Sequence, residues 1–340
     1  MHLKNGTIIL KNTPSIRSFA SVVGKKEGEG PLAPYFDIIE SDTKFGEKTW
    51  EKAESKMQQI ACQVALSKVH LDKKDIDVLF AGDLLNQCIG SGYSARELDI
   101  PFYGLYGACS TMAESLALAS IFVSFNIVNR ALALTSSHFC SAERQFRQPL
   151  EYGGQRTPTS QWTATASGAI LVEKNHGAPY VKAVTIGKIT DLGIKDINNM
   201  GAAMAPAAYN TIKSFLEDTK SNPNDYDLIL TGDLGVVGSD LLIKLLLKDG
   251  IDISKVHNDC GKMLFDIEEQ QVNSGASGCG CGASVLCSLI LNQIKDGVLK
   301  NVLFIATGAL MSPTSTQQGE SIPAIAHLVH ISNDKNIEKR

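Results

Sequence analysis

DIDVLFAGDL, at residues 75–84, returns as DYDLILTGDL at residues 225–234, and two further strings return in the same order. These are GACSTMAESLALAS (107–120), which returns as GCGCGASVLCSLIL (278–291), and RALALTSS (130–137), which returns as NVLFIATG (301–308). Three matches in one order, two of them at the same offset, indicate an internal duplication. The period is far too long for a solenoid of stacked repeats.

The segments around these strings alternate between strand-like and helix-like patterns. The predicted elements are strands over residues 75–82, 101–107 and 130–137 and helices over residues 50–64 and 110–126. Each of these strands is a short β-rich run, and apolar residues recur at helical spacing in the helices. A strand–helix–strand order predicts an α/β fold in which helices cover a parallel sheet.

The duplication divides the chain into two similar α/β halves, which we place at residues 1–175 and 176–340. The first half carries an additional loop-like tract at about residues 139–165, which is rich in Arg, Gln, Pro and Gly. Loops that are supported by a sheet commonly hold binding and catalytic residues. We therefore expect functional residues in this inserted tract.

The composition of the chain excludes several classes of protein. The 340 residues are 44% hydrophobic and carry a formal net charge of −4, which allows a packed core and argues against general nucleic-acid binding. The longest apolar stretches are shorter than the roughly 20 residues that span a bilayer, and no signal-peptide core precedes them. We expect an intracellular protein whose eight cysteines are reduced, with no metal site, because Cys279 and Cys281 have no second pair nearby.

Cys109 is the first candidate for chemistry, because it lies where a predicted strand ends and a predicted helix begins. The positive end of a helix dipole is expected to lower the pKa of a thiol placed there. One interpretation is therefore an acyl-accepting thiolate. The alternative is a small residue that fits a tight turn.

Duplicated α/β halves with a Gly-Ala-Cys-Ser turn before a helix resemble the thiolase-like fold, which implies layers in the order α-β-α-β-α. Longer strings resemble the stage V sporulation protein AD family of spore-forming bacteria over nearly the whole chain. The strings are FGEKTWEKAE (45–54), AGDLLNQ (81–87), GACSTMAES (107–115), TSSHFCSAERQFRQPLEYGGQ (135–155), MAPAA (204–208), DYDLILTGDL (225–234), HNDCG (257–261) and SIPAIAH (321–327).

The resemblance implies a catalytically retired thiolase-like protein that binds dipicolinic acid, pyridine-2,6-dicarboxylate. Such a protein helps to load this compound, with calcium, into the developing spore, and it needs no cofactor. The alternative is a condensing acyltransferase of the ketoacyl-synthase type. An ionised Cys109 would oppose a dianionic ligand, so we predict a neutral thiol in the ligand-bound state.

The resemblance to ketoacyl synthases also implies partners for Cys109 from the second half. His257 in HNDCG and Asn273 in NSGASGCG are similar to the His and Asn that complete a Cys-His-Asn set in those enzymes. Such residues would raise the thiolate content and donate to a developing oxyanion. True thiolases use a second cysteine near the C-terminus, but this chain has none after Cys287, so ordinary thiolysis is not expected.

The string ERQFRQP supplies candidate ligand-binding residues. Arg144 and Arg147 are three residues apart, so one helical turn would place them on the same face. Guanidinium groups bind carboxylates with two parallel hydrogen bonds, which suits a dicarboxylate. The other candidates are His138, Phe146, Tyr152, Gln155 and Asp83. The arginines could instead pair with Glu143 and Glu151 in a solvated loop, or bind an acyl-carrier phosphate.

Asp83 and Asp233 each follow a matched strand in the string GDL. Ligands often bind beyond the carboxyl ends of strands, so either carboxylate could contact one. Because both halves carry the string, a structural role such as capping or hydrogen bonding between the halves is favoured.

The expected partners follow from the resemblance. They are dipicolinic acid, the other stage V sporulation A membrane proteins and a second copy of the chain in a homodimer. Without a spanning segment, attachment to the forespore or spore inner membrane would be peripheral, through those partner proteins.

Overall fold

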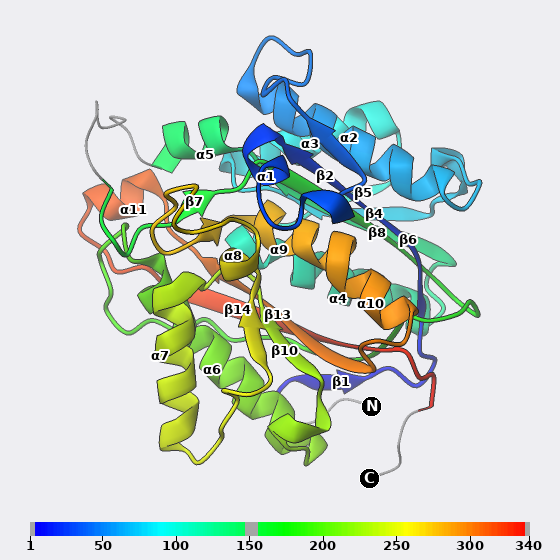
Figure 1. Ribbon diagram of the computed structural model, residues 1–340. Helices are drawn as coiled ribbons and strands as arrows, with labels where there is room; N and C mark the ends of the chain where they lie inside the picture. The colour runs from blue at the N-terminus through cyan, green and yellow to red at the C-terminus, as the bar shows by residue number, and fades with distance from the viewer. Residues whose placement is uncertain (1–3, 147–155, 337–340) are drawn as a thin grey trace.

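The computed structural model describes residues 4–146 and 156–336, and its strands form two groups (Figure 1). The first group runs β3 (Ile38–Glu40), β2 (Ser15–Gly24), β8 (Ala166–Glu173), β6 (Arg130–Ser137), β4 (Val78–Gly82) and β5 (Phe102–Gly104). The second runs β11 (His257–Asp259), β10 (Leu228–Thr231), β13 (Asn301–Ala309), β14 (Ala324–Ser332), β9 (Tyr180–Thr185) and β1 (Thr7–Ile9). The groups join where Ser15 of β2 pairs with Tyr180 of β9.

Strand direction is mixed, which corrects the expectation of a parallel sheet. β4 is parallel to β5 and β6, and β10 is parallel to β11 and β13. Helices connect these neighbours, as parallel pairing requires. In contrast, β8 is antiparallel to β2 and β6, and β14 is antiparallel to β13 and β9.

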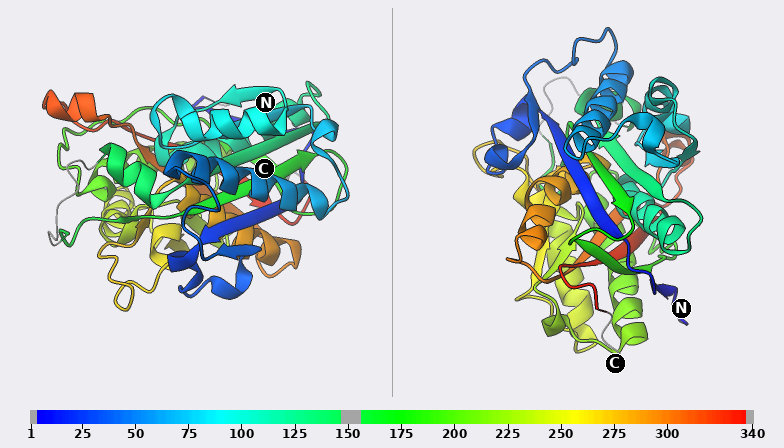
Figure 2. Two further views of the ribbon diagram at one scale, coloured as in Figure 1. Left: turned by 90° about the horizontal axis from the view of Figure 1, so that it is seen from above. Right: turned by 90° about the vertical axis from the view of Figure 1, so that its right-hand side faces the viewer.

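Helices occupy three layers, so the predicted α-β-α-β-α architecture is confirmed (Figures 1 and 2). The outer layers are α2 (Trp50–Ser67) and α3 (Ile89–Leu98) over the first group of strands, and α6 (Met200–Thr219) and α7 (Gly235–Lys248) over the second. The middle layer is α4 (Thr111–Ser124), α9 (Cys279–Val285), a π-helical turn (Leu286–Ile290) and α10 (Leu291–Lys295). The short elements are α1 (Lys25–Gly28), α5 (Phe139–Phe146), α8 (Cys260–Met263), α11 (Pro313–Gln317), β7 (Trp162–Thr163), β12 (Ala276–Ser277) and the 3₁₀ turns 33–35, 73–75, 86–88, 108–110 and 223–225.

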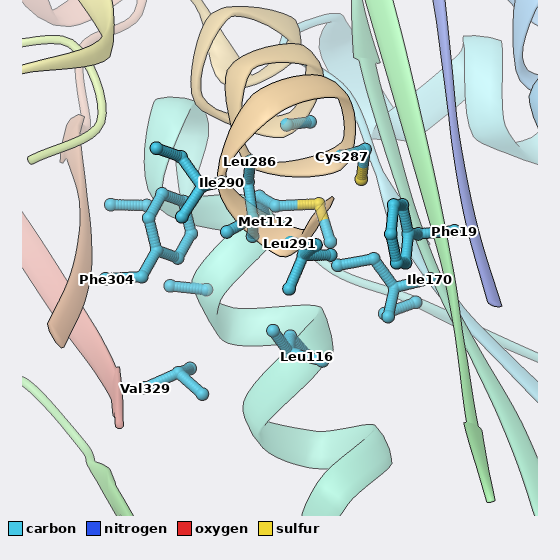
Figure 3. Packing of buried hydrophobic residues seen from close by; sticks show 14 of the residues in the cluster. Phe19, Met112, Leu116, Ile170, Leu286, Cys287, Ile290, Leu291, Phe304 and Val329 are labelled. Carbon is cyan, nitrogen blue, oxygen red and sulfur yellow. The ribbon is translucent and has the colours of Figure 1, made fainter. Parts of the chain in front are cut away.

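The middle layer is buried on both sides, which explains its continuous apolar sequence. Met112 and Leu116 of α4 pack beside Leu286, Ile290 and Leu291 (Figure 3). Phe19 and Ile170 cover this cluster from the first group of strands, and Phe304 and Val329 cover it from the second. A helix that faces two sheets needs apolar residues all round rather than on one stripe.

The predicted elements are present with small shifts of their ends. The matched strings occupy β4 and β10, the starts of α4 and α9, and β6 and β13. The helix expected near residues 50–64 is α2, which begins after Thr49, whose hydroxyl accepts a hydrogen bond from the Lys52 backbone N–H at 3.3 Å. This is a standard N-cap.

The structure shows where the predicted boundary between the halves and the predicted inserted tract lie. Residues 175 and 176 lie between β8 and β9, and β1 from the start of the chain pairs with β9. The tract at 139–165 contains α5 and β7, so it is not loop throughout. In the parts of the chain that the structure describes, no helix combines the length and the apolar character that crossing a membrane requires.

Candidate functional site

Cys109 lies in a tight turn between β5 and α4, where the two halves of the chain meet. Ala108 has a φ of +48°, a conformation that is unfavourable for a residue with a side chain. The turn is pressed against β13 of the second half, because a Cβ on Gly308 would lie 2.1 Å from the Gly107 carbonyl oxygen. Residue 308 therefore has to be glycine for the halves to close around Cys109.

A cavity of about 40 Å³ lies in front of this turn. Its polar lining residues are Tyr106, Cys109, Glu143, Thr163 and Ser277, and most of the remaining wall is apolar, including Leu84, Phe146, Met200 and Met311. A water needs roughly 10–15 Å³ of such volume, so the cavity has room for about three waters. Both halves and the inserted tract contribute to its walls.

Asp233, which follows β10, is the charged residue that acts most strongly on the Cys109 thiol. The Asp233 carboxylate accepts hydrogen bonds from Gly278 N at 2.9 Å and Thr307 Oγ1 at 3.0 Å, with Ser277 Oγ at 3.4 Å. Asp233 thus links β13 to the start of α9.

Burial, and then the Asp233 carboxylate, raise the pKa of the Cys109 thiol well above its ordinary value. The helix dipole alone would have the opposite effect, so the expectation of a lowered pKa was wrong. The physical reason is that loss of solvation and a nearby negative charge both disfavour a thiolate. Cys109 is therefore a neutral thiol at pH 7, the protonation state predicted for the ligand-bound protein.

His257 and Asn273 have other partners. His257 Nε2, on β11, lies 3.0 Å from Thr231 Oγ1, and burial lowers the pKa of its imidazole to about 4. Asn273 Nδ2 donates to Ser160 Oγ at 3.2 Å. Among the described residues that line the cavity with Cys109, neither is present. Ser277 lines the cavity instead, and Asp233, which is not part of the lining, acts on the thiol through its charge.

Asp83 is buried within the first half. Its carboxylate accepts hydrogen bonds from Ser91 N and Ser91 Oγ, both at 2.7 Å, and from Leu85 N at 2.9 Å. It holds the start of α3 and does not line the cavity in the described part of the chain. The Asp of the duplicated GDL string therefore caps a helix in the first half, and in the second half it influences the Cys109 thiol through its charge.

The predicted ligand-binding residues of the inserted tract are separated in the structure. Phe146 lines the cavity, but Arg144 forms an ion pair with Glu51 of α2. His138 is buried, with its Nε2 2.8 Å from the Thr43 carbonyl oxygen. The remaining three, Arg147, Tyr152 and Gln155, lie outside the described residues.

Sequence reasoning missed a charged pair at this site, in which Glu143 lines the cavity and Arg156 binds Glu143. Glu143 was considered only as a surface partner, yet it is 2% exposed and lines the cavity. Its Oε2 accepts a hydrogen bond from Arg156 Nη2 at 3.1 Å, and its Oε1 accepts one from Thr163 Oγ1 at 3.1 Å. The available signal was the high density of charged and aromatic residues in the tract.

Comparison with known proteins identifies the family. The chain matches the family model of stage V sporulation protein AD over residues 4–332. It is 46% identical over 321 residues to stage V sporulation protein AD of Bacillus subtilis (strain 168), covering 94% of this chain and 95% of that protein.

Solved structures share the fold at low sequence identity. They include 3-oxoacyl-[acyl-carrier-protein] synthase III from Aquifex aeolicus VF5 (14% identity, TM-score 0.56, covering 94% of this chain and 99% of that one). Another is OleA from Xanthomonas campestris with bound cerulenin (14% identity, TM-score 0.60, covering 96% and 98%). The fold is therefore that of the thiolase-like ketosynthases, and the chain belongs to the stage V sporulation protein AD family.

Proposed function

We propose that this protein binds dipicolinic acid and takes part in loading it, with calcium, into the developing spore, on a thiolase-like scaffold that does not catalyse acyl transfer. Membership of a sporulation family supports the biological setting. The observation that carries the non-catalytic assignment is the buried position of the Cys109 thiol near the Asp233 carboxylate, because both raise the pKa of the thiol and keep it neutral. A nucleophilic cysteine requires a thiolate.

The chemistry of the inserted tract supports a dicarboxylate ligand. Arg144, Arg147 and Arg156 lie within 13 positions of the chain, and guanidinium is the best side-chain receptor for a carboxylate. Tyr106 and Phe146 line the cavity and offer rings against which a pyridine could stack. The cavity of about 40 Å³ is too small for this ligand, so binding requires side chains such as Phe146 to turn outward.

Titration calorimetry with dipicolinic acid tests this proposal. We expect saturable binding by the wild type, weaker binding by Arg147→Ala, and retained binding by Cys109→Ala, because a neutral thiol contributes little to holding a dianion. Arg96→Ala is the matched control, since Arg96 is an exposed arginine on α3 that pairs with Glu97 at 2.8 Å. Pyridine-2-carboxylate, which lacks one carboxylate, should bind more weakly than dipicolinic acid.

Absence of saturable binding up to millimolar dipicolinic acid would refute the proposal. The alternative function, a condensing acyltransferase, would then come first, because Cys109 still lines a cavity at the start of a helix. Mass spectrometry after incubation with acyl-CoA decides it. An adduct on Cys109 would support the enzyme, and an unmodified protein would argue against it.

We further propose that the protein acts as a homodimer attached peripherally to the other stage V sporulation A membrane proteins. β5 is a strand at the end of the sheet order, and its residues Phe102 and Tyr103 are exposed. An edge strand with exposed aromatic residues is a ready template for pairing with a second copy.

A further inference from the structure

Glu143, which lines the Cys109 cavity, forms an ion pair with Arg156, which is not part of the lining, and the proposed function gives the pair itself no role. Arg156 Nη2 lies 3.1 Å from Glu143 Oε2, and the two side chains are 27% and 2% exposed. Glu143 lines the cavity next to Thr163, whose hydroxyl donates to Glu143 Oε1. Thr163 is in turn the register partner of Ser277, beside Cys109 in the lining.

Two aromatic rings and a backbone carbonyl hold the guanidinium of Arg156 in addition to the Glu143 carboxylate. The guanidinium lies 4.7 Å from the centre of the Trp162 ring and 5.5 Å from that of Phe139, and these two rings stack on each other at 4.4 Å. Arg156 Nη1 also donates to the Gln161 carbonyl oxygen at 3.3 Å. These contacts do not involve Glu143, so they keep the cation in place if the carboxylate moves away.

A dianionic ligand that enters this cavity meets the carboxylate of Glu143. Two negative groups in a site with little water repel each other strongly, unless a cation lies between them or one carboxylate moves. Within residues 4–146 and 156–336, Arg156 is a cation that can serve both, because a planar guanidinium has several N–H donors in a fixed fork. In the unliganded protein, Nη2 of this guanidinium already donates to Glu143.

We propose that Arg156 is the carboxylate receptor of the site and that Glu143 is an internal competitor, which a ligand carboxylate displaces from the guanidinium. In the unliganded protein Glu143 neutralises Arg156 and so avoids an unpaired, partly buried cation. On binding, Phe139 and Trp162 hold Arg156 while its acceptor is exchanged. This assignment rests on the proposed binding of dipicolinic acid and adds the residue that selects for a carboxylate.

The exchange predicts opposite effects for the two members of one ion pair. Glu143→Gln preserves the shape and an acceptor for Thr163 but removes the competing charge, so dipicolinate should bind about tenfold more tightly. Arg156→Gln removes the receptor, so binding should weaken by about tenfold or more. Arg156→Lys keeps the charge without the fork and should recover only part of the affinity.

Calorimetric titration with dipicolinic acid measures these affinities in the full-length protein. Glu97→Gln and Arg96→Gln are the matched controls, because that pair on α3 is exposed, and both should bind like the wild type. Thermal unfolding of each variant checks that it is folded. In a Trp50→Phe background, the fluorescence of Trp162 should change on titration in the Arg156 protein and not in Arg156→Gln.

The exchange would be supported if Glu143→Gln binds dipicolinic acid more tightly than the wild type, Arg156→Gln binds it more weakly, and both control variants bind it like the wild type. If the wild type binds and both variants weaken binding, or neither changes it, the pair is only structural and the assignment is wrong while the proposed function stands. If the folded wild type shows no saturable binding, the proposed function fails and the assignment falls with it.

Discussion

Replacing Asp233 by Asn should make Cys109 reactive. In the wild type, burial and the Asp233 carboxylate both keep the thiol protonated. Burial raises the pKa of Asp233 itself to about 7, so this carboxyl is ionised at pH 8–9 and acts there as a negative charge. The variant removes that charge and keeps the size of the side chain, so the pKa of Cys109 should fall.

Coulomb's law gives an upper limit for the size of this effect. Unit charges about 4 Å apart interact by about 4 kcal/mol at an effective dielectric constant of about 20. One pKa unit corresponds to about 1.4 kcal/mol, so the pKa of the thiol should fall by up to about three units. At a fixed pH below that pKa, the thiolate fraction and the alkylation rate should rise by up to about 1000-fold.

Iodoacetamide labelling followed by peptide mapping measures this rate at Cys109 separately from the other cysteines. The labelling is done between pH 8 and 9.5, where Asp233 of the wild type is ionised. Asp83→Asn is the matched control, because Asp83 has the same position in the GDL string of the first half and its carboxylate caps α3 instead. Thermal unfolding confirms that both variants are folded under the labelling conditions.

Two results would refute this reasoning. One is a wild-type Cys109 whose labelling already follows a pKa below about 8, because the thiol would then be ionised despite its burial. The other is a folded Asp233→Asn protein that labels no faster than Asp83→Asn. In either case Asp233 does not control the state of the thiol.

Three further predictions concern the rest of the fold. Gly308→Ala should lower the free energy of unfolding in urea by about 2 kcal/mol or more, because its methyl would meet the Gly107 carbonyl, whereas Gly92→Ala, with open space around its Cβ position, should not. Burial raises the pKa of Glu27 to about 7, so the folded wild type keeps a proton that the unfolded chain loses above about pH 4.5. The stability of the wild type therefore falls as the pH rises from about 4.5 to 7. In urea unfolding, the difference in free energy of unfolding between Glu27→Gln and the wild type should shift in favour of the variant by about 3 kcal/mol from pH 4 to pH 8. The same difference at both pH values would contradict this. Tyr103→Asp on β5 should dissociate the proposed homodimer in light scattering, unlike Tyr35→Asp at a similarly exposed tyrosine.

Much of the fold was predictable because its signals are local or repeated. The apolar run over residues 110–126 and the amphipathic face from Trp50 predict α4 and α2 from their own periodicity. The duplicated strings identify equivalent elements in both halves without any knowledge of contacts. Strand direction was not predictable in the same way, because β8 and β14 reverse the sheet and no helical crossover marks them.

The candidate site was predictable only in part. Cys109 was identifiable because its turn is a local pattern at the start of a helix. Its partner was not, since two acidic GDL strings are present and only one of them faces the thiol. The resemblance pointed to His257 and Asn273, but in the structure Ser277 lines the cavity with Cys109 and Asp233 acts on the thiol through its charge.

The sequence by itself determined the duplicated α/β architecture, the family and the position of Cys109 at a helix start, because periodicity, repetition and turn residues act between near neighbours in the chain. The tertiary structure decided the chemistry of the site. Asp233 is brought to Cys109 from 124 positions away, and Glu143 and Arg156 are paired across the inserted tract. Burial and long-range charge then set the protonation of the thiol, and neither can be read from the residues that flank it.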